Sequence, residues 1–276
     1  MNIRANVFQN CIGLKIVKLP VLMKDLNLFA FDGCNNLEAV HIDSKNQYYT
    51  VDENAIYDKD KTTIILGIKG RTFYDYIIPT TVNKIEKYAF YQCLRLQSIV
   101  IPESVNSIGS SAFEKCELLD SVRIYGHLKN ISSNTFKNCK SLGLIILPPT
   151  IEAIRSEAFW GCVSLENIKL PFSLKEIGQY AFCECKSLKS TIIPELVESI
   201  GIGSFGRCEA LDSVKIYGQL KEIDSFLFYE CKSLKSVTLP QTIEKIHWDA
   251  FRNFISLENI TLPSNLKKIS ELAFAG

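Results

Sequence analysis

Phenylalanine recurs every 23 residues along about two-thirds of this 276-residue chain. Repeats of 20 to 50 residues are typical of solenoid proteins, whose units are too small to bury an apolar face alone and do so by stacking on their neighbours. The period therefore predicts a single repeat array, before any other feature is considered. The series consists of Phe90, Phe113, Phe136, Phe159, Phe182, Phe205, Phe228, Phe251 and Phe274.

Each unit has the pattern Ala-Phe-x-x-Cys-x-x-Leu-x-x-(Val/Ile)-x-(Ile/Leu)-Pro-x-(Ser/Thr)-(Val/Ile/Leu)-x-x-Ile, as between Ala89 and Ile108. The β-branched residues alternate with a period of two, which predicts a short strand with one buried face. The proline lacks an N–H donor and fits the end of that strand. Phe, Cys and Leu lie at i, i+3 and i+6, which favours one helical or 3₁₀ turn. Each coil should thus hold a strand, a corner, an extended return and a helical turn, with successive strands parallel and about 4.8 Å apart.

The period is interrupted once, near the start of the chain. Phe8 and Phe31 keep the spacing, but Phe90 comes 59 residues after Phe31, an excess of 36 residues. Two β-rich segments in this excess flank the polar turn Asp58-Lys59-Asp60-Lys61, which predicts a hairpin projecting from one coil. We therefore expect one domain over residues 1–276, with a hairpin-like insertion at about 43–77.

A longer period is also present. The segment from Cys116 to Gly126 matches the segment from Cys208 to Gly218 at an offset of 92 residues, which is four units. Such a match indicates that a four-unit block was duplicated. Similarity between units can reflect this copying, so it does not mark a site.

The unit resembles the 23-residue leucine-rich repeat of the BspA type, and the hairpin resembles an insertion that many of those proteins carry. The resemblance covers nearly the full chain. It implies a strand-rich α/β repeat solenoid, a right-handed horseshoe with a concave parallel sheet and short helical or 3₁₀ turns. It also implies a protein of the cell surface that takes part in adhesion and binds host or matrix proteins. It does not imply catalysis. The chain departs from the pattern at Thr191, where an apolar strand residue is expected, and at Phe254, which replaces the cysteine.

The charge balance bears on the class of partner. With 31 basic and 30 acidic residues the net charge is +1, so we expect neither nucleic-acid binding nor attraction to an anionic membrane. No stretch of 18 apolar residues occurs, so we expect no membrane insertion. Residues 1–20 lack a clean apolar signal core and already contain Phe8 and Cys11. The protein is therefore expected at the cell surface or secreted if a signal has been removed, and in the cytoplasm otherwise.

The ten cysteines suggest neither disulfides nor a metal site. Nine should stack as a buried column, because free cysteine behaves as a small hydrophobic residue. Zinc would need paired ligands, and the only histidines are His41, His127 and His247, so we expect no metal and no cofactor. Cys183 lies in a polar, variable column and should face solvent. The nine are Cys11, Cys34, Cys93, Cys116, Cys139, Cys162, Cys185, Cys208 and Cys231.

One motif invites a nucleotide-binding interpretation. Residues 201–206 spell G-x-G-x-x-G, which binds dinucleotides only where a strand leads into a full helix. Here Phe205 is the phenylalanine of the repeat, and Gly201 occupies the place of Gly109 and Gly178. We therefore interpret these glycines as part of the repeat, and we find no catalytic motif elsewhere.

One residue per coil lies between the two inward positions of each strand and should face solvent. A rigid sheet presents such side chains at low entropic cost, so they could bind a protein ligand. The alternative is that β-branched residues at these positions simply favour strands. The candidate binding residues are Val100, Arg123, Ile146, Lys169, Ile192 and Lys215.

The sequence thus predicts a non-enzymatic protein-binding module for surface adhesion or recognition, whose ligand is a protein of a host or matrix. The alternative is an intracellular scaffold of the same fold. An enzyme is the third alternative, and would need a pocket joining His127 or His247 to acids. The last coil is unfinished after Phe274, so we expect end-to-end self-association or a frayed last unit, with Leu262, Leu266, Ile269 and Phe274 facing outward.

Overall fold

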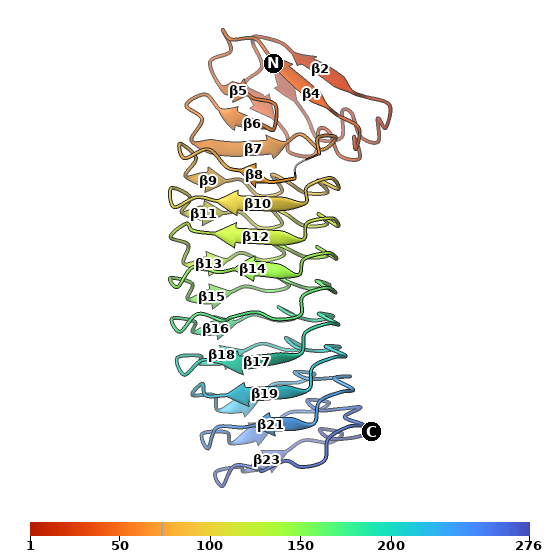
Figure 1. Ribbon diagram of the computed structural model, residues 1–276, viewed down its shortest axis with the longest axis vertical. Helices are drawn as coiled ribbons and strands as arrows, with labels where there is room; N and C mark the ends of the chain where they lie inside the picture. Colours follow the sequence, from red (N-terminus) through yellow and green to blue (C-terminus); the bar gives the residue numbers. More distant parts are fainter. Residues whose placement is uncertain (73) are drawn as a thin grey trace.

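The computed structural model describes residues 1–72 and 74–276 as a stack of coils, most of them bearing a front and a back strand (Figure 1). The front strands are β2 (Ile16–Leu19), β4 (Ala39–Ile42), β8 (Tyr76–Ile77), β10 (Ser98–Ile101), β12 (Ser121–Ile124), β14 (Leu144–Ile146), β17 (Ser190–Ile193), β19 (Ser213–Ile216) and β21 (Ser236–Thr238). The back strands are β1 (Asn2–Ile3), β3 (Asp25–Leu26), β9 (Lys84–Ile85), β11 (Ser107–Ile108), β13 (Asn130–Ile131), β15 (Ala153–Ile154), β16 (Glu176–Ile177), β18 (Ser199–Ile200), β20 (Glu222–Ile223), β22 (Lys245–Ile246) and β23 (Lys268–Ile269).

Paired strands lie parallel and in register with the repeat. On the front, Val100 lies opposite Arg123, and on the back, Lys84 lies opposite Ser107. The front strands form three sheets, β2-β4, β8-β10-β12-β14 and β17-β19-β21. The expected solenoid of stacked parallel strands is therefore confirmed. The back strand of each coil was missed, because its segment was predicted only as an extended return.

The phenylalanine column forms the centre of the stack. Every member from Phe90 to Phe251 is fully buried. Successive rings from Phe90 to Phe274 lie nearly parallel, with centroids 4.8 to 5.9 Å apart. Because each ring is covered by the rings above and below, no coil can bury its own phenylalanine alone.

The predicted helical turns are wrong, since residues 1–72 and 74–276 contain no helix. Single turns do form, as when Cys93 N donates to Phe90 O at 3.0 Å. Residues two places before and after most of these phenylalanines, such as Tyr88 and Gln92, have φ of about +60° (60° and 56°). This left-handed conformation turns the N–H toward the next coil, where Gln92 N meets Glu114 O at 2.9 Å. A helix cannot propagate through such residues.

The cysteine column is buried as predicted, with one exception. Each thiol from Cys116 to Cys231 in this column donates to the phenylalanine carbonyl one coil earlier, as Cys116 Sγ does to Phe90 O at 3.0 Å. Cys11 is exposed. Cys183, predicted to face solvent, is only 8% exposed because aromatic side chains of neighbouring coils, including Trp160, surround it. Burial raises the pKa of the Cys183 thiol to about 11.

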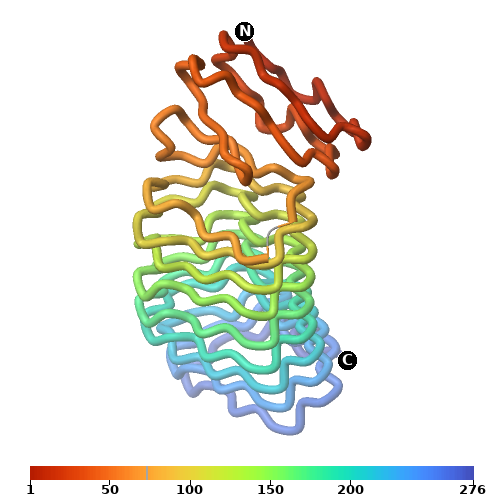
Figure 2. Tube along the Cα trace, turned by 45° about the horizontal axis from the view of Figure 1, so that its top comes forward, coloured from red at the N-terminus to blue at the C-terminus, as the bar shows by residue number. Residues whose placement is uncertain are grey.

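The insertion forms a partition inside the stack. Strands β5 (Tyr49–Val51), β6 (Ala55–Asp58) and β7 (Thr63–Gly67) are antiparallel, with the predicted polar turn between β6 and β7, and β7 pairs with β9. Ile56 packs in the core of the first coils, whereas Tyr57 packs in the core of the rest. The hairpin is therefore buried rather than projecting, and Figure 2 shows the first coils inclined to the stack beyond it. Phe73, inside the predicted insertion, lies outside the described residues.

Gly67 occupies the place that phenylalanine takes in the other coils, so the phenylalanine period did not reveal this coil. Its N–H donates to Ala89 O at 2.7 Å, the bond that Phe90 N makes to Ala112 O at the same distance. A Cβ on Gly67 would lie 2.4 Å from the ring of Phe90, so only glycine fits. Residues 32–67 are thus one enlarged coil.

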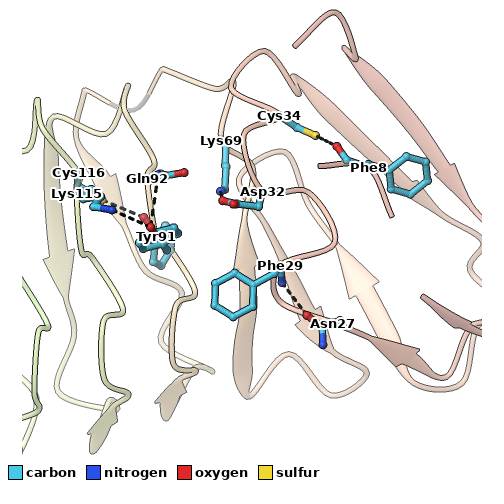
Figure 3. Close-up of polar contacts among 11 residues, drawn as sticks. Phe8, Asn27, Phe29, Asp32, Cys34, Lys69, Tyr91, Gln92, Lys115 and Cys116 are labelled. Carbon is cyan, nitrogen blue, oxygen red and sulfur yellow. Dashed lines mark hydrogen bonds and ion pairs between the residues drawn. The ribbon is translucent and has the colours of Figure 1, made fainter. Parts of the chain in front are cut away.

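An ion pair with a buried lysine joins the first coils to the main stack (Figure 3). Lys69 is 4% exposed, and its Nζ lies 3.4 Å from Asp32 Oδ1 and 5.5 Å from the ring centroid of Tyr91. Phe29 packs against Tyr88 beside it, with ring centroids 4.7 Å apart. The junction therefore combines one buried charge with aromatic contacts from both sides of the partition.

Replacing Phe159 with alanine should destabilise the fold by about 3 to 5 kcal/mol, because it leaves a cavity between two stacked rings. Chemical denaturation would measure the change, and hydrogen exchange should show that the loss of protection reaches the adjacent coils. A loss under about 1 kcal/mol would contradict the assignment of this column as the core.

A thiol reagent should label one cysteine rapidly in the native protein, because reaction requires an accessible thiolate. The exposed Cys11 should account for that fast phase, so Cys11→Ser should abolish it. Cys183→Ser is the matched control and should leave the fast phase intact. Rapid labelling that survives Cys11→Ser would show that the column is open to solvent.

Asp32→Ala should destabilise the junction by about 3 kcal/mol, because it leaves the Lys69 ammonium buried without its counter-ion. Lys69→Met keeps the side-chain volume and removes the buried charge, so its thermal unfolding temperature should stay close to that of the wild type. Equal losses in the two variants would mean that packing of the Lys69 stem, rather than its charge, stabilises the junction.

Candidate ligand-binding face

The six predicted binding residues lie in one line across the front of the stack, here called the front stripe (Val100, Arg123, Ile146, Lys169, Ile192 and Lys215). Val100, Arg123 and Ile146 are opposite one another on β10, β12 and β14. Ile192 and Lys215 are opposite one another on β17 and β19. Lys169 lies in the coil between these sheets, and all six side chains are at least partly exposed.

Ile77 extends the front stripe and was missed by the sequence analysis. It pairs with Val100 and is well exposed. Its coil carries Gly67 in place of the repeat phenylalanine, so the 23-residue phenylalanine period does not mark this coil. The pattern Tyr76-Ile77-Ile78-Pro79 could have revealed the strand, because it ends in the proline of the repeat.

The three cations of the front stripe have no carboxylate partner. Within residues 1–72 and 74–276, no ion pair involves Arg123, Lys169 or Lys215. They recur at every second coil, with Ile146 and Ile192 between them. The front therefore presents unneutralised positive charge at a regular spacing.

On the back of the stack, by contrast, many charges pair across coils. Glu152 accepts from Lys129 at 2.6 Å and from Lys175 at 2.9 Å, and these two bonds lower the pKa of Glu152 to about 2. Glu222 likewise meets Lys245 at 2.8 Å and His247 at 2.6 Å, which lowers the pKa of Glu222. Opposite charges on adjacent strands stabilise the sheet, so these residues are accounted for by the fold.

A groove of about 680 Å³ interrupts the front stripe between Lys169 and Ile192. Four apolar side chains stand in its wall well exposed to solvent, with Phe172 at 81% the most exposed of them. The four are Phe172, Ile192, Leu196 and Tyr217. Exposed apolar residues gathered in a groove are typical of a binding surface, whereas scattered ones are not.

The groove lies where the front ladder is interrupted between β14 and β17. Residues 167–170 are not a strand, and in the described chain their N–H and C=O groups make no hydrogen bond to either neighbouring coil. The back ladder stays intact there, with Ala153 opposite Glu176. Phe159 also remains 5.5 and 5.2 Å from its neighbouring rings. Only the front of the stack opens at this point.

Two departures from the repeat coincide with the groove. Thr191 occupies an inward position that is apolar in the other coils, and its Oγ1 is buried without a hydrogen-bond partner in the part of the chain that the structure describes. Leu196 replaces a serine or threonine whose hydroxyl elsewhere donates across coils, as Ser173 Oγ does to Ile151 O at 2.6 Å. The four-unit duplication does not explain them, because the matching positions hold Ile99 and Ser104.

The other candidate sites do not combine into catalytic chemistry. His247 does lie beside Glu222, but both are exposed on the back of the stack and neither lines the groove. Residues 201–206 form turns and a short notch, in which Gly203 has φ of +62° and leaves room for the Tyr180 ring. In the described ranges no three His, Cys, Asp or Glu residues are grouped to hold a metal ion. No helix among the described residues is long and apolar enough to cross a bilayer.

Solved structures with the same architecture are leucine-rich-repeat proteins. A leucine-rich repeat protein from Bacteroides ovatus is 24% identical, with 98% of this chain and 78% of that chain covered and a TM-score of 0.67. The T. pallidum leucine-rich repeat protein TpLRR is 28% identical, with coverages of 77% and 89% and a TM-score of 0.53. The pneumococcal vaccine antigen PcpA is 21% identical, with coverages of 94% and 56% and a TM-score of 0.52. No protein with a curated description is significantly similar to this chain.

The sequence profile of the BspA type leucine rich repeat region matches the chain in six copies, over residues 1–77, 69–189 and 175–276. Together these ranges span all 276 residues. The profile and the similar structures indicate no catalytic family. With its stacked parallel strands and 23-residue period, this chain belongs to the BspA-type leucine-rich-repeat family.

Proposed function

We propose that this protein binds another protein through the front stripe, in surface adhesion or recognition of a host or matrix protein. The observation that carries the proposal is the contrast between the two sides of the stack. Many charges on the back are paired across coils, whereas Arg123, Lys169 and Lys215 on the front form no ion pair within the described residues and stand in one line. Exposed charges contribute little to folding, so a role in binding accounts better for this regular row of cations.

The rigidity of the stack favours this role. Each front side chain stands on a coil fixed by its neighbours, so little conformational entropy is lost when a partner binds. A folded array over residues 1–276, joined through the partition and the Lys69–Asp32 pair, would act as one domain. We also propose that the stack takes a right-handed horseshoe form with the front stripe on its concave side.

An intracellular scaffold is the second candidate, and the cysteines favour it. All ten cysteines lie in the described residues and none forms a disulfide. Disulfides persist in oxidising compartments, so a chain with ten free thiols suits a reducing one. Alkylation of the protein as it occurs in its own cell, before lysis, would separate the two: ten reduced thiols and a cytosolic location favour the scaffold.

Replacing Arg123, Lys169 and Lys215 together with glutamate should leave the unfolding temperature nearly unchanged, because exposed charges contribute little to folding. The same variant should lose the protein partner that the wild type captures, because it reverses the charge of the whole stripe. Capture would be quantified with immobilised protein against the purified partner, once identified by cross-linking.

The matched control places the same three charge reversals away from the stripe, at Lys87, Lys221 and Lys268. These lysines are exposed and make no ion pair in the described part of the chain. The control variant should bind the partner as the wild type does. Equal binding by the two triple variants would contradict a site on the front stripe.

A further inference from the structure

We propose that the front stripe binds an acidic polyproline II segment of a protein partner, with an acidic residue at every third position and its prolines in the groove beside Ile192. This inference rests on the proposed protein-binding function and specifies the partner. Two independent observations carry it: the spacing of the unpaired cations and the apolar groove that interrupts them.

The spacing of the cations selects the conformation of the ligand. Adjacent parallel strands lie about 4.8 Å apart, so cations on every second coil lie about 10 Å apart along the stack. The ring centroids of the coils at the groove, 5.5 and 5.2 Å apart, agree with this spacing. In polyproline II, residues three apart lie on the same edge of the helix and about 9.3 Å apart. A β-strand presents the same face every second residue, at about 6.7 Å, so its side chains do not match cations about 10 Å apart.

The charge of the stripe selects the charge of the ligand. Arg123, Lys169 and Lys215 present three positive groups in a row without a counter-ion from the described chain. A segment with carboxylates at i, i+3 and i+6 would place one opposite each of them. Such complementarity fixes the register of the segment on the stack and excludes basic partners.

The groove selects the residues between the acids. Its exposed apolar walls are Phe172, Ile192, Leu196 and Tyr217, two of them aromatic, and the exposed carboxylate of Glu195 also lines it. The apolar walls would therefore meet prolines, whereas the acids of the segment would lie at the cations rather than beside Glu195. Proline-rich segments dock into grooves lined by aromatic side chains, because they already hold the bound conformation and lose little entropy. Prolines between successive acids would therefore meet the groove where it lies between Lys169 and Lys215.

The departures at the groove fit a ligand and oppose folding. A buried hydroxyl without a partner is unfavourable, yet Thr191 replaces the apolar residue found in the matching coil. Among the described residues, the neighbouring backbone N–H groups of residues 167–170 also have no hydrogen-bond partner. Polyproline II carries free carbonyl groups, since it has no internal hydrogen bonds, and these can accept from such donors.

The proposal is tested with a fluorescent peptide of four Glu-Pro-Pro triplets, titrated with the full chain by anisotropy. Two comparison peptides carry the same charge: an isomer with the four glutamates in one block, and a strand-forming peptide of alternating Glu and Val. The triplet peptide should bind at least about tenfold more tightly than either, with an affinity that falls as salt is raised. Equal or tighter binding of the alternating or the block peptide would overturn the proposal.

Three variants locate the site. Lys169→Glu should weaken binding of the triplet peptide by about tenfold, because it reverses the central charge. Phe172→Ala should weaken it by about fivefold or more, as expected for a contact residue. Ile255→Ala, an equally exposed apolar truncation away from the groove, is the control and should change nothing. Phe172 and Ile255 are both largely exposed, so neither variant should affect folding.

Failure of this inference is distinguishable from failure of the proposed function. If the triplet peptide does not bind, or if Phe172→Ala behaves as Ile255→Ala does, the polyproline II site is overturned. The protein-binding function would still stand if the triple glutamate variant loses its protein partner while the control triple variant keeps it. If both triple variants keep the partner, the function on the front stripe fails as well.

Discussion

The stacking of one phenylalanine per coil between two left-handed residues is the constraint on which the structure depends. Left-handed φ costs a residue other than glycine roughly 1 to 2 kcal/mol. Tyr88 and Gln92 adopt this conformation despite its cost, because it turns their N–H groups toward the next coil, where each donates to a carbonyl. The ring of Phe90 is held between them and covered by Phe113. Strain in one coil is thus offset only by its neighbour, which makes the array cooperative.

This arrangement also explains how a groove can open without loss of the fold. The phenylalanine column and the back ladder fix the distance between coils at two places, so the front ladder is not needed at every coil. At residues 167–170 it is absent, while Phe159 stays stacked and β15 stays paired with β16. A repeat protein can therefore vary its front face coil by coil while the column and the back ladder keep the fold.

The sequence predicted what the period controls and missed what depends on single departures. The phenylalanine and cysteine columns followed from spacing alone. The helical turn was wrong because i, i+3 spacing does not reveal the sign of φ, and residues as different as Tyr88 and Gln92 take the left-handed form. Cys183 was misplaced because its column is polar on average, whereas its own neighbours are aromatic. The residues of the front stripe follow from the strand register and do lie in one line, but the groove depends on a break in the ladder. Thr191 was the one departure at the groove that the sequence analysis noted.

A repeat fold transfers its own period to whatever it binds. Side chains on the front stripe can stand only at multiples of the coil spacing, so a ligand that contacts several coils must offer groups at a matching interval. Placing Arg123, Lys169 and Lys215 on alternate coils doubles that interval and leaves Ile146 and Ile192 between the charges. Few peptide conformations repeat at about 10 Å, and polyproline II is the one that also needs no hydrogen bonds of its own. The spacing of charge along the stack, rather than the identity of any single residue, is then what would set the specificity of this surface.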